Sequence, residues 1–224
     1  MSIEIRKFRN RYDLELIQNS DEKIRIGDLF WDPIFGKPVT NEKGTPTNIF
    51  YSFKDADIID MKLYKKYIDD CDKIKMIDAN LPEVERDLNV DVGLGFSILE
   101  KLKIADIEFK NEHIHSFQFK KIKKKKINID LADVIDTNLE ILKKDNWKAY
   151  DGKIRRVQMI TELLYGEINI KIKNKNKANF ELAIKNAGLD IKPNLETKTA
   201  TNYSFINSKV PFAMKLVSVK NYNG

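Results

Sequence analysis

The longest regular pattern in the chain runs from Val84 to Ile98 and alternates apolar with polar residues. A period of two places the two sets on opposite faces of an extended strand. The apolar set, interrupted only by Arg86, is Val84, Leu88, Val90, Val92, Leu94, Phe96 and Ile98. A tilted membrane strand needs about 9–11 residues, so this strand is long enough to cross a bilayer. It fits equally well as a half-buried strand of a soluble sheet.

Alternation elsewhere predicts further strands. The segments concerned are 12–16, 24–26, 113–122, 157–165, 168–172, 180–184, 189–191, 203–205 and 210–216. The apolar parity changes after Gly166, and it also changes near Ala105 and Asp106, where we expect a bulge or a turn. A turn is predicted at 186–188, where Asn, Ala and Gly follow one another.

Helical spacing is clearest at 131–144, where Leu131, Ile135, Leu139 and Leu142 recur on one face. A second helix is predicted from Asp55 or Asp57 to about Cys71, and 2–10 could form a short basic helix. These elements predict one α+β domain spanning 1–224. We expect a strongly twisted, mostly antiparallel sheet with two to three peripheral helices.

Composition narrows the class of protein. The chain has 224 residues, a formal net charge of +6 and a single cysteine, Cys71. One cysteine cannot form an internal disulfide framework, which favours a reducing cytosol. The N-terminus lacks the apolar core of a signal peptide, and no apolar run reaches the roughly 18 residues of a membrane helix. We therefore expect a cytoplasmic protein that meets a membrane, if at all, through amphipathic strands or surface helices.

Two kinds of segment could contact a membrane surface. Basic side chains cluster in 6–11 and 120–126, and large apolar side chains crowd a Pro- and Gly-containing segment, 29–38, which we expect to be a loop. A basic helix beside an exposed apolar loop would hold a peripheral protein on anionic lipid. The candidate contact residues are Arg6, Lys7, Arg9, Arg11, Phe30, Trp31, Ile34, Phe35, Lys120, Lys121, Lys123 and Lys124. The lysine run fits equally well as a solvated turn.

Catalytic chemistry has fewer candidates. His113 and His115 would share one strand face, but zinc needs a third and a fourth ligand, so no metal site is predicted. Asp91, followed by Glu108 and Lys110 on the next strand, has the pattern of a magnesium-dependent nuclease. No dinucleotide fingerprint or phosphate-binding Gly-x-x-x-x-Gly-Lys loop is present, and no cofactor is expected.

Five segments carry a resemblance to a known family. They are Tyr12–Gln18 with Ile24–Phe30, the glycine-bearing Leu88–Leu99, Phe117–Phe119 leading into 131–142, Arg156–Leu164 with its Val-Gln-Met-Ile-Thr-Glu, and Val210–Leu216. In this order they resemble the gasdermin pore-forming domain, especially its bacterial branch. Phe30 and Trp31 would then lie in the loop that the family uses as a membrane-touching tip.

The resemblance implies a non-enzymatic protomer that extends amphipathic β-hairpins, assembles into a large ring and perforates an anionic membrane in a bacterial cell-death or antiviral defence. The segments 84–110 and 157–192 would insert. Such a protein is cytoplasmic when inactive and lies at the inner or plasma membrane when active. No inhibitory tail follows the closing strand, so we expect either an inhibitory protein acting in trans or activation without proteolysis.

Two further departures from the family pattern concern single residues. Cys71 is poorly placed for the N-terminal lipid modification of bacterial members. Lys101, Lys103, Glu108 and Lys110 would have to face the pore lumen or lie outside the hydrocarbon. The alternatives to a pore former are a β-rich module that binds nucleic acid or an acidic protein, and the magnesium nuclease.

Overall fold

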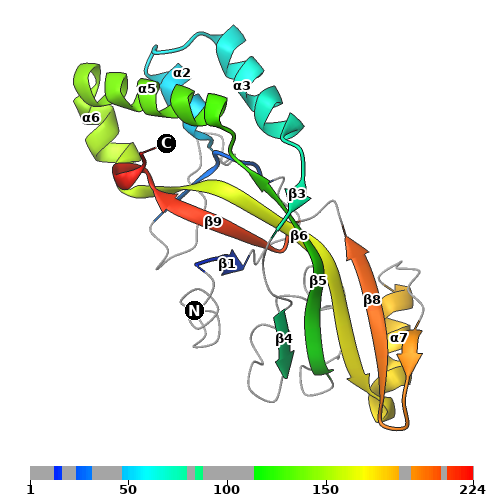
Figure 1. The fold of residues 1–224 in the computed structure, drawn as a ribbon. Coiled ribbons are helices and arrows are strands. Elements are labelled where there is room, and N and C mark those ends of the chain that lie inside the picture. Colours follow the sequence, from blue (N-terminus) through cyan, green and yellow to red (C-terminus); the bar gives the residue numbers. More distant parts are fainter. Residues whose placement is uncertain are drawn as a thin grey trace. The chain divides into compact units, whose positions relative to one another are not determined.

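The computed structural model describes residues 13–16, 24–31, 47–79, 84–87, 114–186, 193–207 and 211–223, and every structural statement below concerns them. The strands are β1 (Glu15–Leu16), β2 (Leu29–Trp31), β3 (Ile77–Asp78), β4 (Val84–Asp87), β5 (Ile114–Lys126), β6 (Val157–Lys173), β7 (Pro193–Glu196), β8 (Ala200–Asn207) and β9 (Ala213–Ser218). The helices are α2 (Ile49–Asp55), α3 (Met61–Lys73), α5 (Ile129–Asp145), α6 (Trp147–Ala149) and α7 (Lys177–Asn186), with the short turns η2 (Tyr150–Ile154), η3 (Asn174–Asn176) and η4 (Val219–Asn221). The predicted α+β class with a mostly antiparallel sheet is confirmed (Figure 1).

The chain packs into two compact units that are each discontinuous in sequence. Unit 1 contains Met1–Lys23, Asp78–Lys124 and Leu164–Ala213, and unit 2 contains Ile24–Ile77, Lys125–Leu163 and Met214–Gly224. Strands β5 and β6 contribute residues to both units. Each unit is described by itself.

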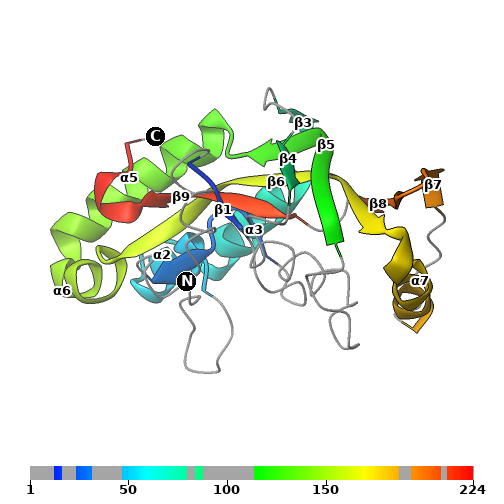
Figure 2. The same ribbon diagram turned by 90° about the horizontal axis from the view of Figure 1, so that it is seen from below.

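Unit 1 is built on antiparallel strand pairs. β4 pairs with the first part of β5, β8 pairs with the second part of β6, and β7 pairs with β8. Helix α7 follows β6 and lies beside β7 and β8 (Figures 1 and 2). Its core includes Ile122, Leu164, Tyr165, Ile170, Ile172, Phe180, Tyr203 and Phe212.

Unit 2 packs helices α2, α3 and α5 with β2 and the first part of β6. Each of these helices begins at a polar residue whose side chain accepts a backbone N–H: Asn48 for α2, Asp60 for α3 and Asn128 for α5. Helix α5 buries Leu131, Ile135, Leu139 and Leu142, as the spacing predicts. Other core side chains are Ile26, Leu29, Phe30, Ile49, Phe50, Phe53, Val157, Met159, Ile160 and Leu163.

Several local predictions are wrong, and each has a physical reason. The described residues contain five α-helices where two to three were expected. The helix expected from Asp55 or Asp57 to about Cys71 begins later, as α3 at Met61, because the unpredicted helix α2 ends at Asp55 and Asp57 has the left-handed φ of 57°. The segment 177–186 is helix α7 although Phe180, Leu182 and Ile184 alternate. Alternation does not exclude a helix, and in this one Phe180 is buried while Leu182 is exposed.

The lysine-rich segment 120–126 is a strand, so its interpretation as a solvated turn is also wrong. β5 continues from Ile114 through Lys126, and Ile122 is buried between exposed Lys121 and Lys123. Likewise, 29–31 is strand β2 rather than loop, because it pairs with the start of β6. Within the described ranges, no helix combines the length and the apolar character that a bilayer crossing requires.

Candidate functional site

Two antiparallel strand pairs of unit 1 flank the segments that the sequence nominates for membrane insertion. β4 and β5 pair from Val84↔Phe119 to Asp87↔Ser116. β6 and β8 pair from Gly166↔Asn207 to Lys173↔Ala200. In each case the intervening chain joins the ends of neighbouring antiparallel strands, which is the position of a hairpin loop.

The chain between β6 and β8 includes helix α7, which is held by one buried aromatic contact. The rings of Phe180 and Tyr203, both fully buried, meet edge to face with centroids 4.8 Å apart. The Tyr203 hydroxyl donates a 3.0 Å hydrogen bond to Glu181. Burial raises the pKa of Tyr203, and the hydrogen bond to Glu181 raises it further. The phenol therefore stays protonated at neutral pH and can hold α7 on β8.

The outer surface of this region carries exposed leucines. Leu182 on α7 is 56% exposed and Leu195 on β7 is 59% exposed. Their neighbours are polar: Lys177 donates a 2.7 Å bond to Glu196 across an exposed surface. Exposed leucines contribute little to the packing of unit 1, so they are available for contacts in another state.

Strand β7 is short and attached only along one side. It pairs with β8 alone among the described strands, and its register is irregular between Pro193 and Leu195. Pro193 has no N–H to donate, which suits an edge strand. The Asn194 side chain donates a 2.7 Å bond to Ser204 Oγ on β8, and Ser204 also bonds Asn169 on β6. Few bonds must therefore break to detach β7.

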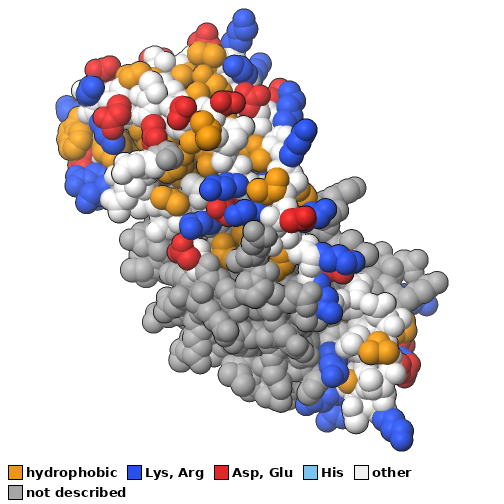
Figure 3. Space-filling view, viewed as in Figure 1, with side chains coloured by type: hydrophobic (Ala, Val, Ile, Leu, Met, Phe, Trp, Pro, Cys, Tyr) orange, Lys and Arg blue, Asp and Glu red, His pale blue; other side chains and the backbone are white. Residues whose placement is uncertain are grey.

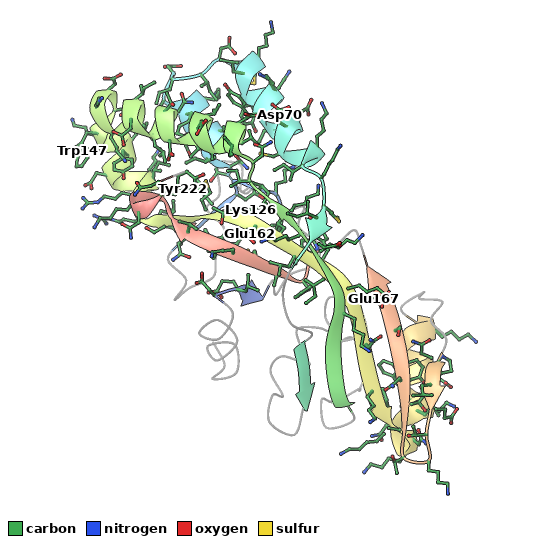
Figure 4. All side chains as sticks on the ribbon, in the orientation of Figure 1. Asp70, Lys126, Trp147, Glu162, Glu167 and Tyr222 are labelled. Atoms are coloured by element: carbon green, nitrogen blue, oxygen red, sulfur yellow. The ribbon has the colours of Figure 1, made fainter. Side chains whose placement is uncertain are left out.

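The predicted change of parity at Gly166 is seen only in part. Before the glycine, β6 buries Val157, Met159, Leu163 and Tyr165 but also Ile160 and Leu164 of the other parity, and after it Ile170 and Ile172 are buried. A Cβ at Gly166 would lie 2.9 Å from the carbonyl oxygen of Lys120 on β5, which excludes any larger residue without a shift. Next to this contact, Lys121 has a φ of 48°, and its Nζ lies 2.6 Å from Glu167 Oε1. Figure 4 labels Glu167 on β6.

The four candidate lysines all lie on β5 within unit 1. Lys121 forms the ion pair with Glu167, and Lys124 also interacts with another group in the structure. Lys120 and Lys123 lie on the same strand, and Lys123 is exposed. The run therefore presents positive charge along a strand.

The two described residues of the aromatic segment have different environments. Phe30 is buried in unit 2, at 7% exposure, so in this structure it does not contact a membrane surface. Trp31 is 39% exposed and pairs with Val157 across β2 and β6. The physical reason is the alternation of a strand, which directs neighbouring side chains to opposite faces. Replacing Phe30 would disturb the core, so only Trp31 is a clean probe of lipid contact.

The remaining candidates lie outside the described residues. They are Arg6, Lys7, Arg9, Arg11, Ile34, Phe35, Leu88, Val90, Val92, Leu94, Phe96, Ile98, Asp91, Glu108, Lys110 and His113. His115 lies on β5. In the part of the chain that the structure describes, no group of three or more His, Cys, Asp or Glu residues could hold a metal ion.

Among the carboxyl groups of the described residues, that of Asp28 has the most strongly shifted pKa. Asp28 lies in unit 2, where β2 meets α2. Its side chain is buried and accepts hydrogen bonds from Asn48 Nδ2 at 2.9 Å and from the Arg25 backbone at 2.8 Å. Asn48 also caps α2 and fills the space beside Gly27, whose φ is 86°. Burial raises the pKa of Asp28 to about 6, although both bonds and the Arg25 charge oppose the shift. The arrangement is structural and joins the sheet to a helix.

This pKa predicts a pH dependence of stability. Because the folded pKa lies above the usual 3.8, protonation favours the folded state. The Asp28 contribution is present in full below about pH 4 and is lost as the pH rises through 6, by on the order of 3 kcal/mol in the free energy of unfolding. Urea unfolding of the wild type and of Asp28→Asn between pH 4 and 7 measures this. The difference between the two proteins should change over that window, and parallel pH profiles would contradict the prediction.

Comparison with known proteins does not identify a relative. No protein-family model and no curated protein matches this chain. The case for its function therefore rests on the strand registers, the exposed side chains and the pattern of the sequence.

Proposed function

We propose that this chain is a gasdermin-like, non-enzymatic pore former that assembles on anionic membranes and inserts amphipathic β-hairpins. The observation that carries the proposal is the register of the two strand pairs in unit 1. Extended in sequence through the intervening segments, each register places apolar pairs on one face of a hairpin near its turn. Farther from the turn that face becomes polar, with Asn111, His113 and His115 in the first hairpin and Asn174, Asn176, Thr197 and Thr199 in the second.

The second hairpin follows from β6 and β8. Gly166↔Asn207 and Lys173↔Ala200 define one constant register. In the proposed inserted form this register continues through 174–199, and its turn falls at Asn186 and Ala187, where the sequence analysis places a turn. The four pairs nearest the turn on one face become Ala178 with Leu195, Phe180 with Pro193, Leu182 with Ile191 and Ile184 with Leu189. All eight side chains are apolar.

The opposite face of this hairpin is polar. The same register pairs Lys177 with Glu196, Asn179 with Asn194 and Glu181 with Lys192. Two of these pairs join opposite charges, which stabilises directly opposed cross-strand residues. A barrel strand must present one face to lipid and the other to water, and this division meets that requirement.

The first hairpin follows in the same way from β4 and β5. The register that pairs Val84 with Phe119, continued into the segment 88–113 of the inserted form, places the turn at Lys101 and Leu102. The apolar pairs become Leu94 with Phe109, Phe96 with Ile107 and Ile98 with Ala105. The change from even to odd apolar positions is then a consequence of an antiparallel turn.

This register also gives the charged residues of the first hairpin positions outside the lipid. Glu108 would oppose Gly95, and Lys110 would oppose Gly93, both on the polar face. Lys101 and Lys103 would lie at the turn. The charges therefore line the lumen or lie at the tip, as insertion requires.

Membrane physics dictates self-association. A hairpin edge in lipid leaves backbone N–H and C=O groups unpaired, so only a closed barrel made of many copies is stable there. Helix α7 and strand β7 would rearrange on insertion, and the Phe180–Tyr203 contact would oppose that change until a membrane is bound. We propose a cytoplasmic resting form, an active form in the inner or plasma membrane, an inhibitory protein in trans as a possible restraint, and a role in bacterial cell death or antiviral defence.

Release of a trapped dye from liposomes tests the function. Purified protein should release dye from anionic vesicles in a concentration-dependent manner and leave neutral vesicles intact. The same preparation, tested with Mg²⁺ and DNA or RNA, should show no cleavage, and Glu108→Ala should leave leakage unchanged. Nuclease activity that Glu108→Ala abolishes would instead support the alternative site of Asp91, Glu108 and Lys110.

A further inference from the structure

Unit 2 carries an exposed tryptophan in a strongly basic setting. Trp147 begins helix α6 and is 53% exposed. Figure 4 shows its side chain at the outer end of α6, and Figure 3 shows hydrophobic surface next to basic side chains in that region. Tryptophan is enriched at interfaces, because its ring is apolar while its N–H can stay bonded to water.

Positive charge is concentrated around this residue. The segment 141–156 contains Lys143, Lys144, Lys148, Lys153, Arg155 and Arg156 against only Asp145 and Asp151. Lys143 pairs with Glu140 and Arg155 pairs with Asp151. Lys148, Lys153 and Arg156 are exposed and form no ion pair among the described residues. Their charges are therefore available to an anionic partner.

The local structure fixes the position of Trp147. Its ring lies against Tyr150, with centroids 5.7 Å apart, and Tyr150 is buried. Asn146 caps the turn by accepting the Ala149 N–H at 3.4 Å, and the π-helical turn η2 follows directly. Lys143 Nζ lies 5.8 Å from the centroid of the Tyr150 ring and also donates a hydrogen bond to Glu140. The ring of Trp147 is therefore exposed to solvent while one part of it packs against the buried Tyr150.

The second tryptophan of the chain also lies in unit 2. Trp31 on β2 is 39% exposed and is the register partner of Val157, which directly follows Arg156.

We propose that the surface formed by Trp147, Lys148, Lys153 and Arg156 docks the protein on the headgroups of anionic phospholipid. Tryptophan favours the boundary between hydrocarbon and water, where its ring is buried and its N–H stays bonded. Lysine and arginine beside it are attracted to the negative potential of an anionic leaflet. This inference deepens the proposed function, on whose membrane target it rests, and it assigns the docking step to residues separate from the inserting hairpins.

The fluorescence of a single tryptophan tests the proposal. Trp31→Phe leaves Trp147 as the only tryptophan, and Trp147→Phe leaves Trp31 as a separate probe of the candidate contact at β2. With vesicles containing phosphatidylglycerol, the emission of Trp147 should shift to shorter wavelength and be quenched by brominated acyl chains. With phosphatidylcholine vesicles it should not change. A variant with Lys148, Lys153 and Arg156 replaced by Ser should need more vesicles for the same shift and lose much of the salt dependence of binding.

Each other outcome is decisive. Co-sedimentation with anionic vesicles while Trp147 emission stays unchanged would overturn this docking surface, whatever Trp31 does. A shift produced by duplex DNA or RNA but not by vesicles would replace lipid with nucleic acid. Insertion of Trp147 without dye release would support the docking surface and contradict the pore. No binding to anionic vesicles at low salt would overturn both.

Discussion

A disulfide between positions 194 and 204 should abolish dye release while it is oxidised, and reductant should restore it. Asn194 and Ser204 lie on β7 and β8 and share a 2.7 Å side-chain hydrogen bond. In the proposed inserted form both belong to one continuous strand. Residues ten positions apart on a strand lie about 33 Å apart, whereas a disulfide holds its Cα atoms within about 7 Å. Asn194→Cys with Ser204→Cys would therefore exclude insertion until it is reduced.

The matched control uses a pair that both forms retain. Asn169 and Ser204 are register partners on β6 and β8, and they remain partners in the inserted hairpin. Asn169→Cys with Ser204→Cys should release dye whether oxidised or reduced. Cys71 should not interfere, because it is buried and its burial raises its pKa to about 12. Full leakage from the oxidised 194–204 variant would show that β7 does not leave β8.

Leu182→Arg should reduce dye release by at least about tenfold while leaving the resting fold stable. Leu182 is 56% exposed on α7, so a charge there meets water in the structure described above. In the inserted hairpin the same position faces lipid, where an arginine near the bilayer centre costs about 2–4 kcal/mol in each protomer. Dye release against protein concentration, together with thermal unfolding of the soluble protein, separates the two states.

Asn179→Arg provides the matched control for that charge. Asn179 is also exposed on α7, but the proposed register places it on the polar face opposite Asn194. The Asn179→Arg variant should release dye at close to the wild-type rate. Equal losses from Leu182→Arg and Asn179→Arg would indicate that charge on α7, rather than contact with lipid, controls the activity.

The sequence was sufficient for the elements whose pattern is set by a single buried face. Helix α5 buries the residues that its spacing predicts. The parity pattern of β6 was only partly informative, because β6 buries residues of both parities before Gly166, where the carbonyl of Lys120 leaves no space for a side chain. Helix α7 could not be predicted in this way, because it packs through long-range contacts that include Phe180 with Tyr203 and Lys177 with Glu196. The same residues alternate as a strand would, and in our proposal this ambiguity serves the function.

The candidate site was predictable only in outline. Alternation and the resemblance nominate the segments 84–110 and 157–192, but the facing that we propose for Glu108 and Lys110 in the inserted form needs the β4–β5 register, which the sequence does not provide. Burial of Phe30 was not predictable from an apolar segment containing Pro and Gly, because its strand pairs with distant β6. Trp147 gave no periodic signal, since a single exposed side chain is recognised only when the fold shows what surrounds it.

An environment-sensitive dye on single cysteines along α7 tests the central claim most directly. The positions are Ala178, Asn179, Glu181, Leu182, Ala183 and Lys185, each labelled and then bound to anionic vesicles. Our account predicts emission that alternates with a period of two: positions 178 and 182 in lipid, and 179, 181, 183 and 185 in water. A surface-bound helix would instead group 181 and 185 with 178 and 182, and that grouping would contradict the account.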